Sequence, residues 1–382
     1  MYFLALGILF IMGTFALYYL ANFHRFGRLE NTEPGLSGYP SVSIIIPVRN
    51  EEEHVEQALS SVLKLDYPYL EIVVLDDRST DRTPEILSAI SKANPALKAF
   101  RIGELPKGWL GKNHALKKGA DVSQGEYLLF SDADIYFAPD TLQRALTYMK
   151  KENTDFLALF PEMIVETAGA KIFAATFLVL FMSFARPWAV ANPRNKEGFG
   201  IGAFSLVRRD AYLGMGTHAA IALYPDDDLE LGRRVKKAGF SCRILDGNPL
   251  IKVHWYRTVW ANVLGFEKNY FAGLDFKYSH FIFSSIALSG IYLWPWAGMF
   301  LPFPGQWAYA IICALQLLVF GFTCRKFRVP VVYGLLYPIG VIFFLLTGLR
   351  SVLLTYWQGG IKWRDTFYPL AELKAARKPR RL

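Results

Sequence analysis

The middle of the chain contains the stretch Tyr127-Leu128-Leu129-Phe130-Ser131-Asp132-Ala133-Asp134, in which a short apolar run ends at two aspartates. Four consecutive apolar residues bounded by polar ones are typical of a strand that is buried on both faces of a sheet. In open α/β sheets, ligands bind beyond the carboxyl ends of the strands. Asp132 and Asp134 therefore stand where a ligand is expected, although an Asp-x-Asp pair by itself is a weak signal.

Similar apolar runs, each followed by a helical pattern, extend on both sides of this stretch. The predicted strands are residues 42–48, 71–75, 97–102, 127–130 and 156–160, and the predicted helices are residues 51–64, a segment from 83, 112–120 and 140–150. This alternation predicts an α/β fold, with a mostly parallel sheet that helices cover on both faces.

Both ends of the chain are apolar, whereas charged residues concentrate in the middle. Of the 382 residues, 53% are hydrophobic, a high share for a purely soluble protein. Residues 1–21 carry no charge and are long enough to cross a bilayer. They lack a basic start and a clear cleavage site, so we interpret them as an uncleaved anchor. Further apolar segments lie near 281–302, 306–323 and 329–349.

Basic residues lie beside these apolar segments and account for much of the net charge of +9. They are His24, Arg25 and Arg28, then Arg325, Lys326 and Arg328, and the tail from Lys374 to Arg381. Basic flanks favour the cytoplasmic side and anionic lipid. Nucleic-acid binding needs a basic stripe with groove-reading or aromatic elements, so we exclude nucleic acid as a partner. We predict a multi-pass protein of the cell membrane, with membrane lipid as a partner and a cytosolic catalytic domain.

The predicted organisation has five parts. They are an anchor (1–23), a linker rich in proline and glycine (24–40), an α/β domain (41–275), C-terminal transmembrane helices (276–357) and a basic cytosolic tail (358–382). The three cysteines lack metal-site spacing, so no disulfide framework is expected.

Two apolar segments leave alternatives open. Within residues 171–190, Lys171 and Arg186 bracket only about 14 residues, which favours a helix in the membrane interface over a buried core helix. One anchor plus three full C-terminal spans would put the basic tail outside, against the positive-inside tendency. Pro338-Ile339-Gly340 interrupts the last segment, which could be broken or re-entrant, so the number of spans stays open.

Acidic groups follow three of the predicted strands. They are Asn50-Glu51, Asp76-Asp77 and Asp132-Ala133-Asp134. One acidic strand end is usually a helix cap, but three of them converge on one edge of a parallel sheet. Hard divalent cations take oxygen ligands and bridge to diphosphate groups. The pattern predicts a site for a metal ion with a phosphorylated ligand.

Two further segments carry candidate site residues. Lys112 opens a predicted helix, where helix and side chain together favour a phosphate; a solvated surface lysine is the alternative. Asp226-Asp227-Asp228 precedes a predicted helix at 229–238. Mutual repulsion among three carboxylates raises the pKa of at least one if it is partly buried, which suits a general base. The alternative is an acidic helix start that the macrodipole stabilises.

In their order along the chain, these motifs resemble family 2 glycosyltransferases, which have a GT-A fold. The matching segments are Pro47-Val48-Arg49-Asn50-Glu51, Leu75 to Asp81, Gly111-Lys112, Asp132-Ala133-Asp134 and Asp227-Asp228. The resemblance covers residues 41–275, and it implies a nucleotide-sugar donor.

The resemblance also implies a role for each matched residue. The implied donor-binding residues are Pro47, Asn50, Glu51, Asp76, Lys112, Asp132 and Arg257. Glu51 and Asp76 would contact the uracil of a UDP-sugar, and Asp132 would lie near the ribose and diphosphate.

The metal and the base are implied in the same way. Asp134 would bind Mg²⁺ or Mn²⁺ with His254 as a further ligand, and Asp228 would remove the proton of the acceptor hydroxyl. Gly200-Ile201-Gly202-Ala203 resembles the loop under the acceptor site.

Three strings point to the acceptor. Gly108 to Lys112, Gly265 to Asn269 and Lys362 to Pro369 resemble membrane glycosyltransferases of carotenoid and hopanoid pathways. In those proteins the last string implies a tail on the cytosolic face. Processive members carry an Arg-Trp motif after the base, and no such pair follows Asp228 here.

The resemblance therefore predicts a metal-dependent, inverting transfer of a hexose, glucose being the expected one. The donor would be a UDP-sugar, and the acceptor would be the hydroxyl of a carotenoid or another isoprenoid lipid in the membrane. The alternatives are a polysaccharide synthase and a glycosyltransferase acting on polyprenyl phosphate or glycerolipid. A non-enzymatic membrane scaffold is disfavoured, because carboxylates are costly to cluster without a ligand.

Overall fold

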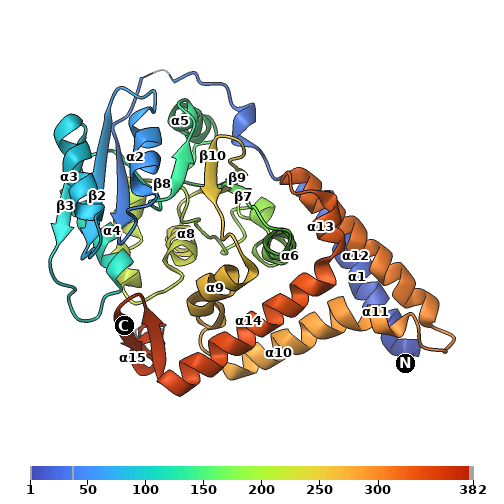
Figure 1. Ribbon diagram of the computed structural model, residues 1–382. Helices are drawn as coiled ribbons and strands as arrows, with labels where there is room; N and C mark the ends of the chain where they lie inside the picture. Colours follow the sequence, from blue (N-terminus) through green and yellow to red (C-terminus); the bar gives the residue numbers. More distant parts are fainter. Residues whose placement is uncertain (1, 37, 378–382) are drawn as a thin grey trace. The chain divides into compact units, whose positions relative to one another are not determined.

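The structure is a computed structural model that describes residues 2–36 and 38–377 (Figure 1). The chain divides into two compact units. The sheet unit comprises residues 26–164 and 187–254, and the helical unit comprises residues 1–25, 165–186 and 255–382. The sheet unit therefore differs from the predicted α/β domain in two places: residues 165–186 interrupt it and group with the helical unit, and so does the segment from 255.

A seven-stranded sheet forms the centre of the sheet unit, with the order β3-β2-β1-β4-β8-β6-β9. Its strands are β1 (Val42–Val48), β2 (Leu70–Asp77), β3 (Leu97–Ile102), β4 (Tyr127–Phe130), β6 (Phe156–Phe160), β8 (Ser205–Arg208) and β9 (Cys242–Asp246). All neighbours pair in parallel except β8, which runs antiparallel to β4 and β6. The prediction of a mostly parallel sheet is confirmed.

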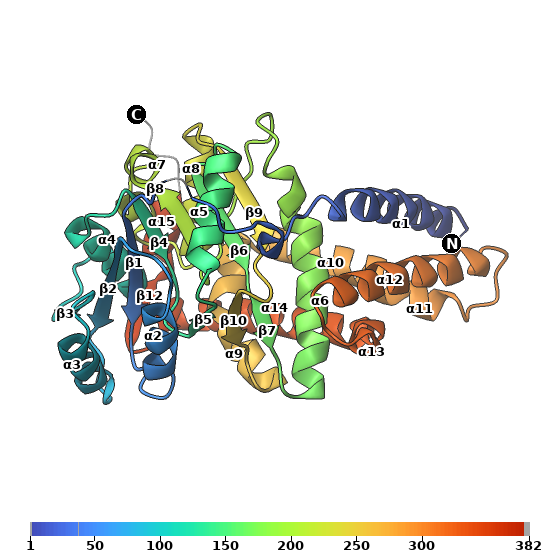
Figure 2. The ribbon, with the colours of Figure 1, turned by 90° about the horizontal axis from the view of Figure 1, so that it is seen from above.

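Helices connect these strands and cover the sheet. They are α2 (Val55–Leu63), α3 (Thr83–Ala93), α4 (Gly111–Val122), α5 (Thr141–Lys151), α7 (Arg209–Gly214) and α8 (Asp227–Lys237). Right-handed crossovers put α2 and α3 on one face of the sheet and α4 on the other, as Figure 2 shows. Helix α4 approaches the sheet closely, because a Cβ added at Gly119 would lie 2.4 Å from a side-chain atom of Ile45.

A second, three-stranded sheet was not predicted, because its strands are too short to show a period. It has the order β5-β10-β7, with β5 (Ile135–Phe137), β7 (Glu162–Ile164) and β10 (Ile251–His254). Strands β10 and β5 are antiparallel, with Val253 opposite Ile135. His254 directly follows Val253 in the chain, and Asp134 directly precedes Ile135.

In the part of the chain that the structure describes, five helices are long and apolar enough to cross a membrane, by length and composition. These segments are Tyr2–Phe23, Ala168–Ala189, Tyr278–Gly298, Gln306–Lys326 and Tyr337–Gln358. They contain α1 (Tyr2–Phe23), α6 (Ala168–Ala185), α10 (Tyr278–Leu288), η4 (Ser289–Leu293), α11 (Trp294–Gly298), α12 (Gln306–Lys326) and α14 (Tyr337–Gln358). Helix α6 begins at Ala168, three residues before Lys171, because Thr167 caps its N-terminus. This start makes α6 longer than the sequence suggests, and its position in the interface stays a prediction.

Helices α1 and α12 run in the same direction. Near their first turns, Ala5 and Met12 pack with Ala308 and Ile312. At their last turns, the ring of Phe23 lies 6.2 Å from that of Phe327. The ends of both helices, each followed by basic residues, therefore lie on one side of the helical unit.

Helix α14 runs from the middle of α12 to the beginning of α10. Its first residue, Tyr337, donates a hydrogen bond to the side chain of Gln316 in the middle of α12. Its second half contacts the beginning of α10, since Gly348 lies against Phe281. Beyond α14 follow the hairpin of β11 (Gly360–Trp363) and β12 (Thr366–Pro369) and helix α15 (Leu370–Arg377). Helix α9 (Val259–Gly273) packs against α14, and α13 (Val331–Leu335) packs against α12 and α6.

Candidate active site

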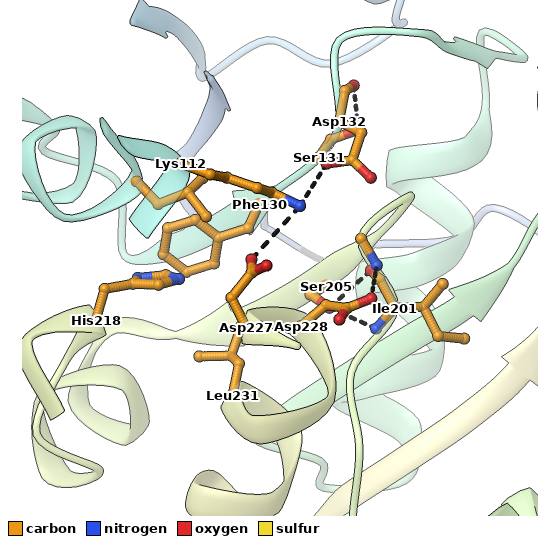
Figure 3. Close-up of a pocket in the computed structure, with 12 residues that line it drawn as sticks. Lys112, Phe130, Ser131, Asp132, Ile201, Ser205, His218, Asp227, Asp228 and Leu231 are labelled. Atoms are coloured by element: carbon orange, nitrogen blue, oxygen red, sulfur yellow. Dashed lines mark hydrogen bonds and ion pairs between the residues drawn. The ribbon is translucent and has the colours of Figure 1, made fainter. Parts of the chain in front are cut away.

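A pocket opens at the carboxyl edge of β4 and the start of α8, within the sheet unit (Figure 3). Residues from four separated segments line it: Lys112 and Leu116, Phe130 to Asp132, Ile201, Gly202 and Ser205, and His218, Asp227, Asp228 and Leu231. Three of the residues predicted from sequence, Lys112, Asp132 and Asp228, are thus brought together. The parallel strands β3 and β4 end at the same edge, and this brings Lys112, which follows β3, towards Asp132, which follows β4.

Lys112 connects the two acidic motifs. Its Nζ lies 2.7 Å from Asp132 Oδ1 and 3.4 Å from Asp227 Oδ2 (Figure 3). Burial would lower the pKa of Lys112, but the carboxylates of Asp132, Asp227 and Asp228 outweigh burial and raise it. The lysine therefore stays protonated and presents a fixed positive charge. The alternative of a solvated surface lysine is wrong, since only 22% of its side chain is exposed.

Asp228 is half-buried at the start of α8, and two backbone amides orient its carboxylate. Gly202 N donates to Oδ2 at 2.9 Å, and Leu229 N donates to Oδ1 at 2.8 Å. Burial raises the pKa of Asp228; Lys112 opposes that rise and Asp132 adds to it. The carboxylate is thus held in one orientation with an increased affinity for a proton, as a general base requires.

Asp134 follows Asp132 at the beginning of β5. Burial, together with the negative charges of Asp132 and Glu51, raises the pKa of Asp134 to about 7. His254 follows Val253, which pairs with Ile135, and its ring lies 5.4 Å from that of Tyr136. Among the described residues, no three His, Cys, Asp or Glu side chains are grouped to hold a metal ion by themselves.

Asp76 ends β2 and is buried, with 3% of the residue exposed. Its Oδ1 accepts a hydrogen bond from Ser79 N at 3.0 Å, and its Oδ2 lies 3.6 Å from Arg101 Nε. In the part of the chain that the structure describes, Oδ2 has no hydrogen-bond partner. Buried polar atoms are nearly always paired, so this oxygen is suited to accept a hydrogen bond from a ligand.

The loop after β1 lies beside Asp76. Asn50 has a positive φ of 52°, and its side chain accepts a hydrogen bond from Thr80 N at 2.8 Å. Glu51 N donates to Thr83 Oγ1 at 2.9 Å, and Pro47 is half-buried within β1. The first two strand ends are therefore joined by hydrogen bonds, which hold the backbone of the loop that carries Glu51 beside Asp76.

Arg257 belongs to the helical unit, where its Nε lies 2.9 Å from Glu166 Oε2. Its side chain is 79% exposed. The predicted role of Arg257 in donor binding stays a prediction.

Sequence reasoning missed two residues that shape the pocket. Ser205 Oγ accepts a hydrogen bond from Ile201 N at 3.1 Å and donates one to Ile201 O at 3.0 Å, which holds the loop beneath Asp228. His218 is buried, shares a 2.9 Å hydrogen bond with Tyr212, and burial lowers its pKa to about 3. Neither residue lies in a motif; only the antiparallel return of β8 brings them to the pocket.

Comparisons with known proteins agree with this architecture. The model of the family described as "Glycosyl transferase family 2" matches residues 43–214. The 4,4'-diaponeurosporenoate glycosyltransferase of Staphylococcus haemolyticus is 22% identical over 267 residues, which are 69% of this chain and 68% of that protein. A beta-monoglucosyldiacylglycerol synthase of Nostoc sp. is 32% identical over 131 residues, 34% of this chain and 28% of that protein.

Among solved structures, the fold matches a mannosyltransferase from Pyrobaculum calidifontis, determined in complex with GDP-Man and Mn²⁺. The TM-score is 0.56 at 17% sequence identity, covering 93% of this chain and 98% of that one. The predicted GT-A fold is thereby confirmed. Residues 43–214 match the model of glycosyl transferase family 2, and the protein is a glycosyltransferase of the GT-A fold.

Proposed function

We propose that this enzyme transfers a hexose from a UDP-sugar to the hydroxyl of a lipophilic acceptor in the membrane, with inversion at the anomeric carbon. The proposed hexose is glucose. The observation that carries this proposal is the geometry of Asp228. Its carboxylate is oriented by two amides, carries a raised pKa and lies beside the pair of Lys112 and Asp132.

In the proposed reaction, Asp228 accepts the proton of the acceptor hydroxyl. The hydroxyl oxygen forms a bond to the anomeric carbon on the face opposite the diphosphate, and the bond from that carbon to the diphosphate oxygen breaks. Lys112 remains protonated and stabilises the negative charge that develops on the departing nucleotide. Removal of a general base typically costs about 10²–10⁴-fold in rate.

The residues around Asp134 fit a divalent cation, Mg²⁺ or Mn²⁺. Burial, together with the negative charges of Asp132 and Glu51, raises the pKa of Asp134 to about 7 and makes its ionised form unfavourable. A cation would stabilise that form, and Mg²⁺ usually binds through one or two carboxylates plus substrate phosphates. We assign Asp134 and His254 as its protein ligands. When bound, such an ion neutralises charge on the diphosphate leaving group.

The nucleotide of the donor is proposed to be UDP, with its uracil base held at the ends of β1 and β2. The support is the buried Asp76 Oδ2, which has no hydrogen-bond partner among the described residues. A carboxylate oxygen accepts a hydrogen bond from the imide N–H of uracil. Glu51, on the neighbouring loop, would contact the same base.

The helical unit supports a proposal for the membrane orientation. The ends of α1 and α12 lie together and are followed by Arg25 and Arg328, and the end of α14 lies beside the start of α10. Basic flanks face the cytoplasm. We infer that the sheet unit, both basic flanks and the tail are cytosolic, with α14 returning to the side where it began. With this arrangement the basic tail stays in the cytosol, whereas three full C-terminal spans would place it outside.

A lipophilic acceptor is supported by these helices and by the similarity to a protein named for a carotenoid acid. The similarity to a glucosyldiacylglycerol synthase supports a glycerolipid acceptor as the second candidate.

The deciding experiment incubates the purified full chain in vesicles with labelled UDP-glucose, Mn²⁺ and either a hydroxylated isoprenoid or diacylglycerol. We expect a glycosylated isoprenoid by mass spectrometry. Labelled diacylglycerol, or a polymer, would favour the alternatives, and no transfer from any UDP-sugar would contradict the proposal.

A further inference from the structure

A second polar cavity, of about 310 Å³, lies within the helical unit, and glycosyl transfer as proposed does not use it. That volume is at the lower end of the range of small-molecule sites, roughly 300–1,000 Å³. Its walls come from α9, the end of α14 and strand β11. The polar residues that matter here are Glu267, Lys268, Thr355, Gln358, Lys362 and Arg364. Two strings noted in the sequence, Gly265 to Asn269 and Lys362 to Pro369, thus meet at one cavity.

The cavity has an excess of positive charge. Lys268, Lys362 and Arg364 contribute three cations, and Glu267 contributes the only lining carboxylate. That carboxylate is already engaged, because Arg350 Nε lies 2.7 Å from Glu267 Oε2. The cavity is therefore suited to an anion.

A ring contact holds one of the three cations, and the other two start from one short hairpin. Lys268 Nζ lies 3.5 Å from the centre of the Trp363 ring, a cation–π contact that links α9 to the hairpin. Lys362 comes from β11, and Arg364 has a positive φ of 51° in the two-residue turn between β11 and β12. Both side chains start from a short paired hairpin, which limits how far they can separate.

Exposed aromatic residues lie on the same elements that form the cavity and its hairpin. Tyr356 and Trp357, at the end of α14, are 66% and 73% exposed, and Trp260 and Phe367 lie exposed on α9 and β12. Tryptophan and tyrosine concentrate where a membrane span meets the headgroup layer. The end of an apolar 22-residue helix is such a position. A basic cavity at this depth on the cytoplasmic side faces anionic lipid headgroups.

We propose that this cavity binds the phosphate of an anionic glycerophospholipid of the cytoplasmic leaflet. The phosphate contacts Lys268, Lys362 and Arg364, and the acyl chains follow the apolar surface of α14. The inference rests on the membrane orientation proposed above, and on neither the donor nor the acceptor. The chemistry of a phosphate is shared by free phosphate and by a nucleoside diphosphate, so both enter the test as competitors.

The test uses the full chain in nanodiscs of phosphatidylcholine with a minor fraction of phosphatidylglycerol. Retained phosphatidylglycerol is counted by native mass spectrometry. We expect the double variant Lys362→Gln with Arg364→Gln to bind phosphatidylglycerol roughly tenfold more weakly, because it loses two cations at the headgroup layer. The exchanged pair, Lys362→Arg with Arg364→Lys, should retain binding, since it conserves the charge.

A matched control removes the same charge from the same side of the helical unit. Lys277 and Arg328 are exposed and do not line the cavity. Their double change to glutamine should leave phosphatidylglycerol binding close to that of the wild type. Equal losses in the test and control variants would show general surface attraction and would overturn the proposal.

Competition separates the possible sources of the phosphate. Inorganic phosphate and UDP, added at the concentration of the lipid, should not displace phosphatidylglycerol. Displacement by either would show a site for a soluble anion instead. Donor binding is measured in parallel on Asp134→Asn, which should lose UDP-sugar while keeping the lipid. Failure of the lipid site is thereby distinguished from failure of the proposed transfer.

Discussion

The backbone amide of Gly202 donates a 2.9 Å hydrogen bond to Asp228 Oδ2. The same residue accepts a 2.9 Å hydrogen bond from Asp132 N through its carbonyl oxygen. One peptide segment thus sets the distance between the aspartate proposed to contact the donor and the aspartate proposed as the base. That distance must match the distance between the diphosphate and the acceptor hydroxyl. A substitution in this loop that changes it should therefore lower the rate of transfer.

Asp228→Asn should keep donor binding and lose transfer. The amide is nearly the same size and keeps one acceptor oxygen for one of the two backbone amides, but its NH2 group cannot accept from the other, and the side chain cannot take a proton. We expect kcat to fall by about 10²–10⁴-fold, with the Kd for UDP from calorimetry within a few-fold of the wild type. A variant with full transfer activity would remove Asp228 from the mechanism.

Gly202→Ala should impair both transfer and donor binding. A Cβ at this position would lie 2.4 Å from Asp132 Oδ2, so the carboxylate or the loop must move. Steady-state kinetics should show a lower kcat and a higher KM for the donor. Gly103→Ala is the control, because no atom lies within 4 Å of its added Cβ. Unchanged kinetics in Gly202→Ala would mean that the loop adjusts freely.

Metal binding should depend on pH through Asp134, whose pKa is raised to about 7. Protons compete with the metal below that pH, so the affinity for Mn²⁺ should increase as pH rises towards 7 and level off above it. Calorimetry between pH 5.5 and 8, roughly spanning that pKa, tests this. An affinity that does not change with pH would contradict the assignment.

Asp134→Asn should make the metal-free protein more stable at neutral and higher pH. A carboxyl whose pKa is raised by folding costs stability once it is ionised, and that cost grows as pH rises above the unfolded value. We expect a higher Tm in the variant at pH 8 without metal, and a loss of Mn²⁺-dependent UDP binding. A lower Tm would show that the Asp134 carboxylate is stabilising.

Asp76→Ala should weaken binding of UDP, because a hydrogen bond to a charged group contributes about 1.5–3 kcal/mol. This corresponds to roughly 10–150-fold in Kd. Binding of a ribose phosphate that lacks a base should not change. If UDP and GDP bind the wild type equally well, the uridine assignment is wrong.

Cysteine labelling should report the membrane orientation. A cysteine at Asp365, in the hairpin turn, should react with an impermeant maleimide only after cells are permeabilised. A cysteine at Gln306, at the start of α12, should react in intact cells. The native cysteines Cys242, Cys313 and Cys324 are buried, so the background is low. Labelling of both positions from the outside would mean that α14 crosses the membrane.

The sequence by itself determined the strand–helix alternation, the acidic strand ends and the apolar ends of the chain. These features depend on the local period of apolar residues, so strands such as Val42–Val48 could be predicted. The resemblance carried by Asp132-Ala133-Asp134 and Asp227-Asp228 then indicated the family, which the comparisons confirm.

Tertiary structure alone decided the rest. The three-residue strands β5 and β7 are too short for a periodic signal, so the register that pairs Val253 with Ile135, next to His254 and Asp134, could not be predicted. The same holds for Lys112 between Asp132 and Asp227, and for the return of α14 beside α10. Each joins residues far apart in the chain, and such pairings are set by packing and strand pairing, on which local sequence patterns carry no information.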